Sequence, residues 1–168
     1  MIKKILSDKI YVGRAIKKHF DSLINDNSKK HEFSDLFTFF GIPFVVSVAF
    51  LWNDVLHSAN MVSAIITIFS IFVGLLMNVL LLAFDLVNKN KGDTIKSDVL
   101  RELTANITYC ILVSLLSIGL CLATQTQICF VNIVSNALLY FFEANFILTL
   151  LMIVKRTYLL FQVEAKAG

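Results

Sequence analysis

Two long stretches without a charged residue constrain the fold more than any other feature of this chain. The first runs from Met61 to Phe84, and the second follows Glu102 and continues without a charge to Glu143. A helix of about 20 apolar residues crosses the hydrocarbon core of a bilayer. The two stretches therefore predict membrane-spanning helices over about residues 61–84 and about residues 104–124, joined as a helical hairpin.

Two further spans are predicted, one on each side of this hairpin. The first covers about residues 36–53 and ends near Trp52, whose amphipathic ring suits a membrane interface. Pro43 lies within it and predicts a kink, because proline removes a backbone donor and clashes with the preceding turn. The other covers about residues 136–154. The predicted fold is therefore an all-α polytopic membrane protein with four transmembrane helices, which form one domain over residues 33–168.

Composition favours the same class of protein. Of the 168 residues, 57% are hydrophobic and 16% are charged, whereas soluble domains carry about 25% charged residues. The net charge of +3 does not predict nucleic-acid binding, because the charges gather at the predicted membrane boundaries. Attraction to anionic lipid and control of topology explain such charges better. The three cysteines are interpreted as packing residues.

The positions of the basic residues predict the orientation in the membrane. Eight of the fifteen Lys and Arg precede the first span, four lie between the second and third spans, and three follow the fourth. The two remaining links contain none. Because Lys and Arg are retained on the cytoplasmic side, both termini and the central turn are predicted to be cytoplasmic, in a bacterial inner (plasma) membrane.

Residues 1–32 are predicted to be a cytoplasmic amphipathic segment. Between residues 1 and 26 the large apolar side chains share one helical face, and most of the lysines fall away from it. Such a helix either lies in the membrane interface or packs against other cytoplasmic segments. Both alternatives stay open at this point.

The turn between the second and third spans is the other predicted cytoplasmic feature. Its two helices are expected to extend beyond the membrane as a helical hairpin. The charged residues of this hairpin either only hold the topology or dock a cytoplasmic partner protein. These candidates are Lys89, Lys91, Lys96, Asp98, Arg101 and Glu102.

Small and weakly polar residues form one stripe along each arm of the central hairpin. Steps of three or four residues place them on a single helical face. Such residues gather where membrane helices touch, because they let backbones approach closely and bond across the gap. The stripes are expected to face each other, a neighbouring subunit of a homo-oligomer, or a narrow wet lumen. They comprise Ser63, Thr67, Ser70, Gly74 and Asn78 in the first arm, and Asn106, Cys110, Ser114, Ser117, Cys121 and Thr124 in the second.

Glu143 is the one charged residue predicted to lie inside a span. A carboxylate there costs about 2.5 to 3.5 kcal/mol on insertion scales, so it should be buried, paired or protonated. Asn136 and Tyr140 fall on its own helical face, and Asn145 lies on a second polar face. The candidates for an intramembrane polar or pore-lining site are Glu143, Tyr140, Asn136 and Asn78. Glu143 is interpreted as a hydrogen-bonded residue that joins helices, as a pore-lining or proton-responsive group, or as a carrier site.

No catalytic or metal-binding pattern is recognisable. His57 lies in an outer link with Asp54 and is interpreted as a solvated residue, with a metal-binding or proton-sensing role as the alternative. His19 and His31 lie in cytoplasmic segments without a partner that spacing predicts. The sequence has no glycine-rich phosphate loop, no His pair at ligand spacing and no Ser with a plausible base. An enzyme, a cofactor and a metal are therefore not expected.

The layout resembles small four-span membrane proteins of bacterial anti-phage systems, such as RexB-like exclusion proteins and KwaA of the Kiwa system. The resemblance covers the basic amino-terminal segment, the polar-striped span at residues 63–78, the charged hairpin at residues 89–102, and a last span that closes in Lys155 and Arg156. It is a similarity of plan without a diagnostic motif. It implies a protein that senses membrane insult, or depolarises the membrane, when a cytoplasmic partner signals infection.

The expected function is therefore that of a non-enzymatic inner-membrane protein that acts as a homo-oligomer. Its expected role is to perturb or monitor the membrane in anti-phage defence and abortive infection, under the control of a cytoplasmic partner. Two other functions stay open. The chain is alternatively a small proton or cation channel or transporter subunit that uses Glu143, or a membrane anchor for a soluble partner enzyme.

Overall fold

The computed structural model describes residue 13 and residues 16–20, 32–53, 55–89, 94–126 and 128–167, with side chains described outside 32–36, 94–96 and 163–167. About 93% of the described residues are helical and none of them forms a strand. The long helices are α3 (Glu32–Trp52), α4 (Ala59–Lys89), α5 (Thr94–Ala123) and α6 (Cys129–Ala167). The predicted all-α class is confirmed.

Three of these helices are long and apolar enough to cross a membrane, namely α4 and most of α5 and α6. At about 1.5 Å per residue, the 31 residues of α4 extend for about 46 Å. The hydrocarbon core of a bilayer is only about 30 Å thick, so α4 is longer than a span requires. The apolar part of α3, Phe37–Trp52, is shorter than the other three. This layout fits a membrane protein, and the fourth span stays a prediction.

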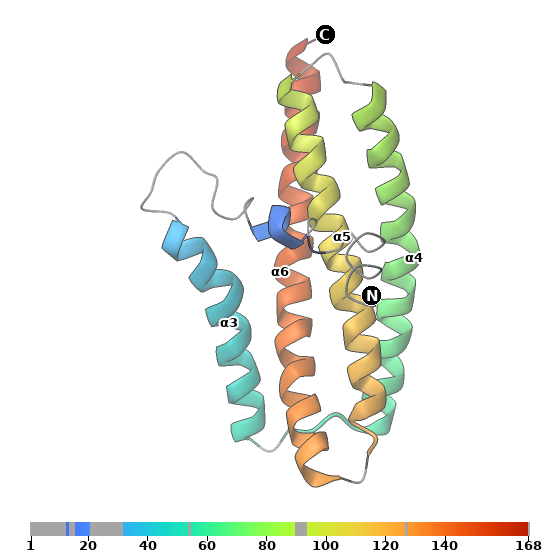
Figure 1. The fold of residues 1–168 in the computed structure, drawn as a ribbon. Coiled ribbons are helices and arrows are strands. Elements are labelled where there is room, and N and C mark those ends of the chain that lie inside the picture. The colour runs from blue at the N-terminus through green and yellow to red at the C-terminus, as the bar shows by residue number, and fades with distance from the viewer. Residues whose placement is uncertain are drawn as a thin grey trace, which may run out of the picture.

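The helices do not pack in chain order (Figure 1). Helix α5 packs against α4 and α6, and α3 packs against α6. Helices α4 and α6 meet through aromatic rings, with Phe146 lying 4.9 Å from Phe69 and 5.3 Å from Phe72. Helix α3 lies on the other side of α6 from α4, so the link between α3 and α4 must cross α6 (Figure 1). This crossing positions the candidate site.

The core lies between α4, α5 and α6. Ile107 and Cys110 of α5 are fully buried there, against Phe69 and Leu76 of α4 and Phe146 of α6. Half of the most apolar stretch of α5 is buried, compared with 11% of the corresponding stretch of α4. Helix α5 is therefore the central helix, and α4 lies at an edge with most of its apolar surface exposed.

The two ends of the helical layer differ in charge. The end of α4, the start of α5 and the end of α6 lie together (Figure 1), and we call this the basic end after Lys89, Arg101 and Lys155. An ion pair between Arg156 of α6 and Glu102 of α5 lies near it. The opposite end, which we call the link end, carries residues 53, 55–58, 124–126 and 128. That the basic end faces the cytoplasm stays a prediction.

Candidate functional site

The link between α3 and α4 carries His57 onto α6. The backbone N–H of Val55 donates to the carbonyl of Phe50, which ties the start of the link to the end of α3. The hydroxyl of Ser58 accepts a hydrogen bond from the backbone N–H of Met61, at 3.3 Å, and so caps the first turn of α4. Held at both ends, the link places His57 in a buried position, with 8% of its surface exposed.

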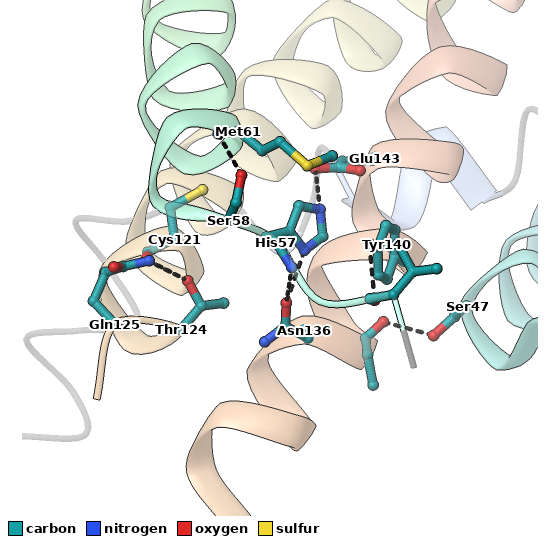
Figure 2. A network of polar contacts seen from close by, with 12 residues as sticks. Ser47, His57, Ser58, Met61, Cys121, Thr124, Gln125, Asn136, Tyr140 and Glu143 are labelled. Carbon is teal, nitrogen blue, oxygen red and sulfur yellow. Dashed lines mark hydrogen bonds and ion pairs between the residues drawn. The ribbon is translucent and has the colours of Figure 1, made fainter. Parts of the chain in front are cut away.

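Asn136 of α6 fixes the protonation of one ring nitrogen of His57 (Figure 2). Its Oδ1 lies 3.0 Å from the backbone N of His57 and 2.8 Å from Nδ1. The orientation of the Asn136 amide is determined by the backbone carbonyl of Asn132, which can only accept a hydrogen bond. Nδ2 of Asn136 donates to this carbonyl at 2.8 Å. Oδ1 therefore accepts from Nδ1, and Nδ1 carries a proton.

The other ring nitrogen of His57 faces Glu143. Its Nε2 lies 3.4 Å from Oε1 of the carboxyl group (Figure 2). In the described part of the chain, this buried oxygen has no hydrogen-bond partner. Because Nδ1 is already a donor to Asn136, a proton that is gained or lost at the ring is exchanged at Nε2. The pair is therefore either an ion pair or a neutral imidazole beside a carboxylic acid.

Tyr140 closes the site on the side of α3. Its hydroxyl donates to the backbone carbonyl of Val55 at 3.1 Å. Its ring stacks on Phe50 at a centroid distance of 4.6 Å and lies 4.1 Å from the ring of His57. One residue of α6 therefore contacts the end of α3, the link and the histidine.

The structure brings together three of the four predicted intramembrane polar residues. Asn136, Tyr140 and Glu143 surround His57, whereas Asn78 is exposed on α4. At about 1.5 Å per residue, Asn78 lies about 28 Å along the helix from its start at Ala59. Asn78 therefore does not belong to this site, and whether the other three residues line a pore stays a prediction.

The interpretation of His57 as a solvated residue is wrong, because the ring is buried against α6. Sequence reasoning also missed that His57 is the partner of Glu143. One signal was present in the sequence. A carboxylate inside a span needs a partner, and His57 is the one basic side chain in the two predicted outer links.

A second polar cluster surrounds Asn145 on another face of α6. Its Oδ1 accepts a hydrogen bond from the hydroxyl of Tyr109 at 2.9 Å. Its Nδ2 donates at 3.0 Å to the backbone carbonyl of Phe39. Pro43, four residues further along α3, has no N–H with which to serve that carbonyl. Asn145 therefore satisfies the group that the proline leaves free, whereas the predicted kink stays a prediction.

His19 joins this second cluster from the amino-terminal segment. Its ring is buried, stacks on Tyr109 at 3.9 Å, and donates from Nδ1 to Oδ1 of Asn106 at 2.8 Å. Burial lowers the pKa of His19, the hydrogen bond with Asn106 raises it, and the charge of Arg156 lowers it, with a net decrease. His19 therefore has partners in Asn106 and Tyr109 that spacing did not predict. His19 and Phe20 pack against other segments. Apart from residues 13, 16–20 and 32, the predicted amphipathic segment over residues 1–32 lies outside the described residues.

The two small-residue stripes have opposite surroundings. All six residues of the α5 stripe are buried, and Ser114 and Ser117 donate to carbonyls of their own helix. All five residues of the α4 stripe are exposed. The expectation that the two stripes face each other is therefore wrong, since the α4 stripe lies opposite the buried face of its helix. The α4 stripe is therefore still predicted to face either a neighbouring subunit or a lumen.

The partner-docking candidates that the structure describes lie towards the basic end. Lys89, Asp98 and Arg101 are exposed. Glu102 is half-buried and forms the ion pair with Arg156. Two further candidates, Lys91 and the side chain of Lys96, lie outside the part that the structure describes.

Metal chemistry finds no support in the described residues, because no three His, Cys, Asp or Glu among them could hold a metal ion. Comparison with protein-family models, with curated proteins and with solved structures finds no match to this chain. The case for a function therefore depends on the contacts and exposures described above.

Proposed function

We propose that the chain is a non-enzymatic membrane protein that assembles with further copies of itself through α4 and makes the membrane permeable to ions. The observation that carries this proposal is the polar stripe on the exposed face of α4. Asn78 is its most polar member, and its amide has no hydrogen-bond partner within the described part of the chain. Lipid chains cannot supply one, and an amide without a partner in an apolar medium is costly.

A second copy of α4 satisfies this amide. Copies that insert with the same topology present their α4 helices in parallel, so Asn78 meets Asn78 at the same depth. An amide both donates and accepts, so the contact is self-complementary. Interhelical hydrogen bonds of this kind contribute about 0.6 to 2 kcal/mol in membranes.

The rest of the stripe permits close approach of the two helices. A Cβ atom added at Gly74 meets nothing within 4 Å, and Ser63, Thr67 and Ser70 are small. The stripe lies opposite the face that α4 buries in the core of its own chain through Val62, Phe69, Leu76 and Ala83. Self-association through the stripe therefore leaves the fold of each chain intact. Three or more copies around one axis would enclose a seam of hydroxyl and amide groups, which is a path for ions.

The anti-phage setting belongs to the same proposal and is supported by the resemblance in layout. In that setting a cytoplasmic protein binds at the basic end, where Lys89, Asp98 and Arg101 are exposed. Its binding then changes the packing of the helices that line the ion path. The same surface supports the anchor alternative, in which the bound partner is an enzyme and no ions pass.

Ion flux in liposomes tests the proposal. The purified full-length chain is reconstituted with an ion-sensitive dye, and efflux is compared across variants at equal protein-to-lipid ratio. Gly74→Ile and Asn78→Leu are expected to lower flux, because both alter the stripe. Gly119→Ile is the matched control, since Gly119 is exposed on α5 and also has open space for a Cβ atom. The proposal fails if the wild-type chain gives no flux, or if Gly74→Ile and Gly119→Ile behave alike.

A second candidate function is proton or cation transport through Glu143. The observation that favours it is the histidine beside this carboxyl group, with Nε2 at 3.4 Å. Here Glu143→Gln lowers flux while self-association is retained, and Asn78→Leu leaves flux per chain unchanged. The two candidates therefore give opposite results with the same set of liposomes.

A further inference from the structure

We infer that His57 and Glu143 form one proton-binding site at the link end, and that the bound proton holds the link between α3 and α4 against α6. The inference does not depend on self-association through α4, because every residue that it uses lies within one chain. The link that it concerns connects α3 to the rest of the fold. The ligand is a proton exchanged at the link end of the helices.

The hydrogen-bond pattern makes this a site for a single exchangeable proton. Nδ1 of His57 is committed to Asn136 at 2.8 Å, and the backbone N–H of His57 donates to the same oxygen at 3.0 Å. Only Nε2 is left, and it faces Glu143 at 3.4 Å. With one proton between them, the two groups attract each other as an ion pair or as an acid and a base. Without it, a lone pair of the ring faces a carboxylate, and both atoms are acceptors.

Among the described residues, the other titratable groups near the pair are neutral at physiological pH. Tyr140 of α6 contacts the imidazole ring and has its hydroxyl bonded to Val55. Cys121 of α5 is buried on the opposite side of the site (Figure 2). A phenol and a buried thiol carry no charge near neutral pH. The net charge of the described part of the site therefore follows the proton shared by His57 and Glu143.

The site is positioned to exchange its proton with the aqueous phase. The side chain of Glu143 is 25% exposed, although Oε1 itself is buried against His57. The link residues beside His57, Val55 and Leu56, are themselves exposed. A proton therefore reaches the pair along the link without passing through the core between α4, α5 and α6.

The direction of the pH response follows from His57. Burial lowers its pKa, but the contact of Nε2 with Glu143, the hydrogen bond with Asn136 and the charge of Glu143 outweigh burial, so the pKa lies above its ordinary value of 6.5. A raised pKa means that the docked link binds the proton more tightly than the released link does. Docking is therefore fully stabilised below pH 6.5, and this stabilisation is lost as pH rises through the higher pKa of the docked state.

Histidine nitrogen NMR tests the proton site itself. The full-length chain with 15N-labelled histidine is titrated in lipid nanodiscs, and His57→Gln identifies the signals of His57. Nδ1 is expected to stay protonated while Nε2 titrates with a midpoint above 6.5. Glu143→Gln is expected to move that midpoint to lower pH without changing Nδ1. A midpoint that is unchanged in Glu143→Gln, or titration at Nδ1, would overturn the inference.

Distances between spin labels test whether the bound proton holds the link against α6. Labels are attached to cysteines introduced at Leu56 of the link and Leu138 of α6, both exposed, after the exposed Cys129 is changed to Ser. The distribution of distances is expected to be narrow at pH 6 and to broaden at high pH. Glu143→Gln is expected to remain narrow at every pH, since its amide donates to neutral Nε2, and Glu143→Leu to be broad throughout.

Two results would contradict the claim that the bound proton holds the link against α6. One is a wild-type distribution that stays narrow as Nε2 loses its proton, and the other is a Glu143→Gln distribution that broadens as the wild type does. The outcome is independent of ion flux. A failure of the liposome experiment therefore leaves this inference standing, and a failure here leaves self-association through α4 standing.

Discussion

Helices α4 and α5 carry the same pattern of small polar residues, yet α5 buries its stripe and α4 exposes it. In α5, Ser114 and Ser117 are fully buried between neighbouring helices. In α4, the equivalent positions Ser70 and Gly74 face away from the rest of the chain. The difference teaches that such a stripe marks a face for close helix contact without identifying the helix that covers it.

The reason for the difference lies in the position of each helix. Helix α5 packs between α4 and α6, so its face is covered within the chain. Its polar groups are also satisfied there, since Ser117 donates to Val113 and Asn106 accepts from His19. Helix α4 lies at the edge, and the amide of Asn78 has no partner within the described residues. The same pattern therefore stabilises the fold in α5 and predicts assembly in α4.

The largest expected effect comes from adding volume to the buried stripe. Ser117→Ile inserts a branched side chain where no space is available, and overpacking of this kind typically costs about 1 to 3 kcal/mol. Thermal unfolding of the detergent-solubilised chain should show a clear decrease in midpoint. Ser117→Ala is the control and should be close to wild type, because the hydroxyl only bonds to its own helix. An unfolding midpoint of Ser117→Ile equal to that of Ser117→Ala would show that α5 is not tightly covered.

An effect of comparable size is expected when the buried amide of Asn145 is removed, and a much smaller one when the exposed amide of Asn78 is removed. Asn145→Leu leaves the carbonyl of Phe39 without a donor beside Pro43, and an unsatisfied buried group costs about 1 to 3 kcal/mol. The expected result is a lower unfolding midpoint and weaker packing of α3 on α6. Asn78→Leu should leave the unfolding of the single chain unchanged and weaken only its self-association. Equal destabilisation by both substitutions would remove the distinction between the two asparagines.

Much of the fold could be predicted from the sequence because charges are excluded from the membrane core. The uncharged runs predicted α4 and α5, and Lys155 follows the apolar part of α6 closely. Spacing along one helix also placed Asn136 and Tyr140 on the face of Glu143, since residues three and seven positions apart share a face.

The rest depended on how the helices are ordered in space. His57 reaches Glu143 because the link crosses α6, and nothing in the local sequence fixes that crossing. Pro43 predicts that some donor must serve the carbonyl of Phe39, but the choice of Asn145 depends on the packing of α3 on α6. The burial of His19 against Tyr109 is likewise a contact between segments distant in the sequence.

Cross-linking of single cysteines in native-like membranes tests the central claim most directly, that the α4 stripe faces another copy of the chain. With Cys129 changed to Ser, the natural cysteines that remain are the buried Cys110 and Cys121. Ser70→Cys lies on the stripe, whereas Ile68→Cys lies at nearly the same depth, about 160° round the helix, and is also exposed. Under mild oxidation, Ser70→Cys is predicted to form a disulfide-linked dimer and Ile68→Cys to stay monomeric. Equal cross-linking at the two positions, or more at Ile68→Cys, would contradict the account.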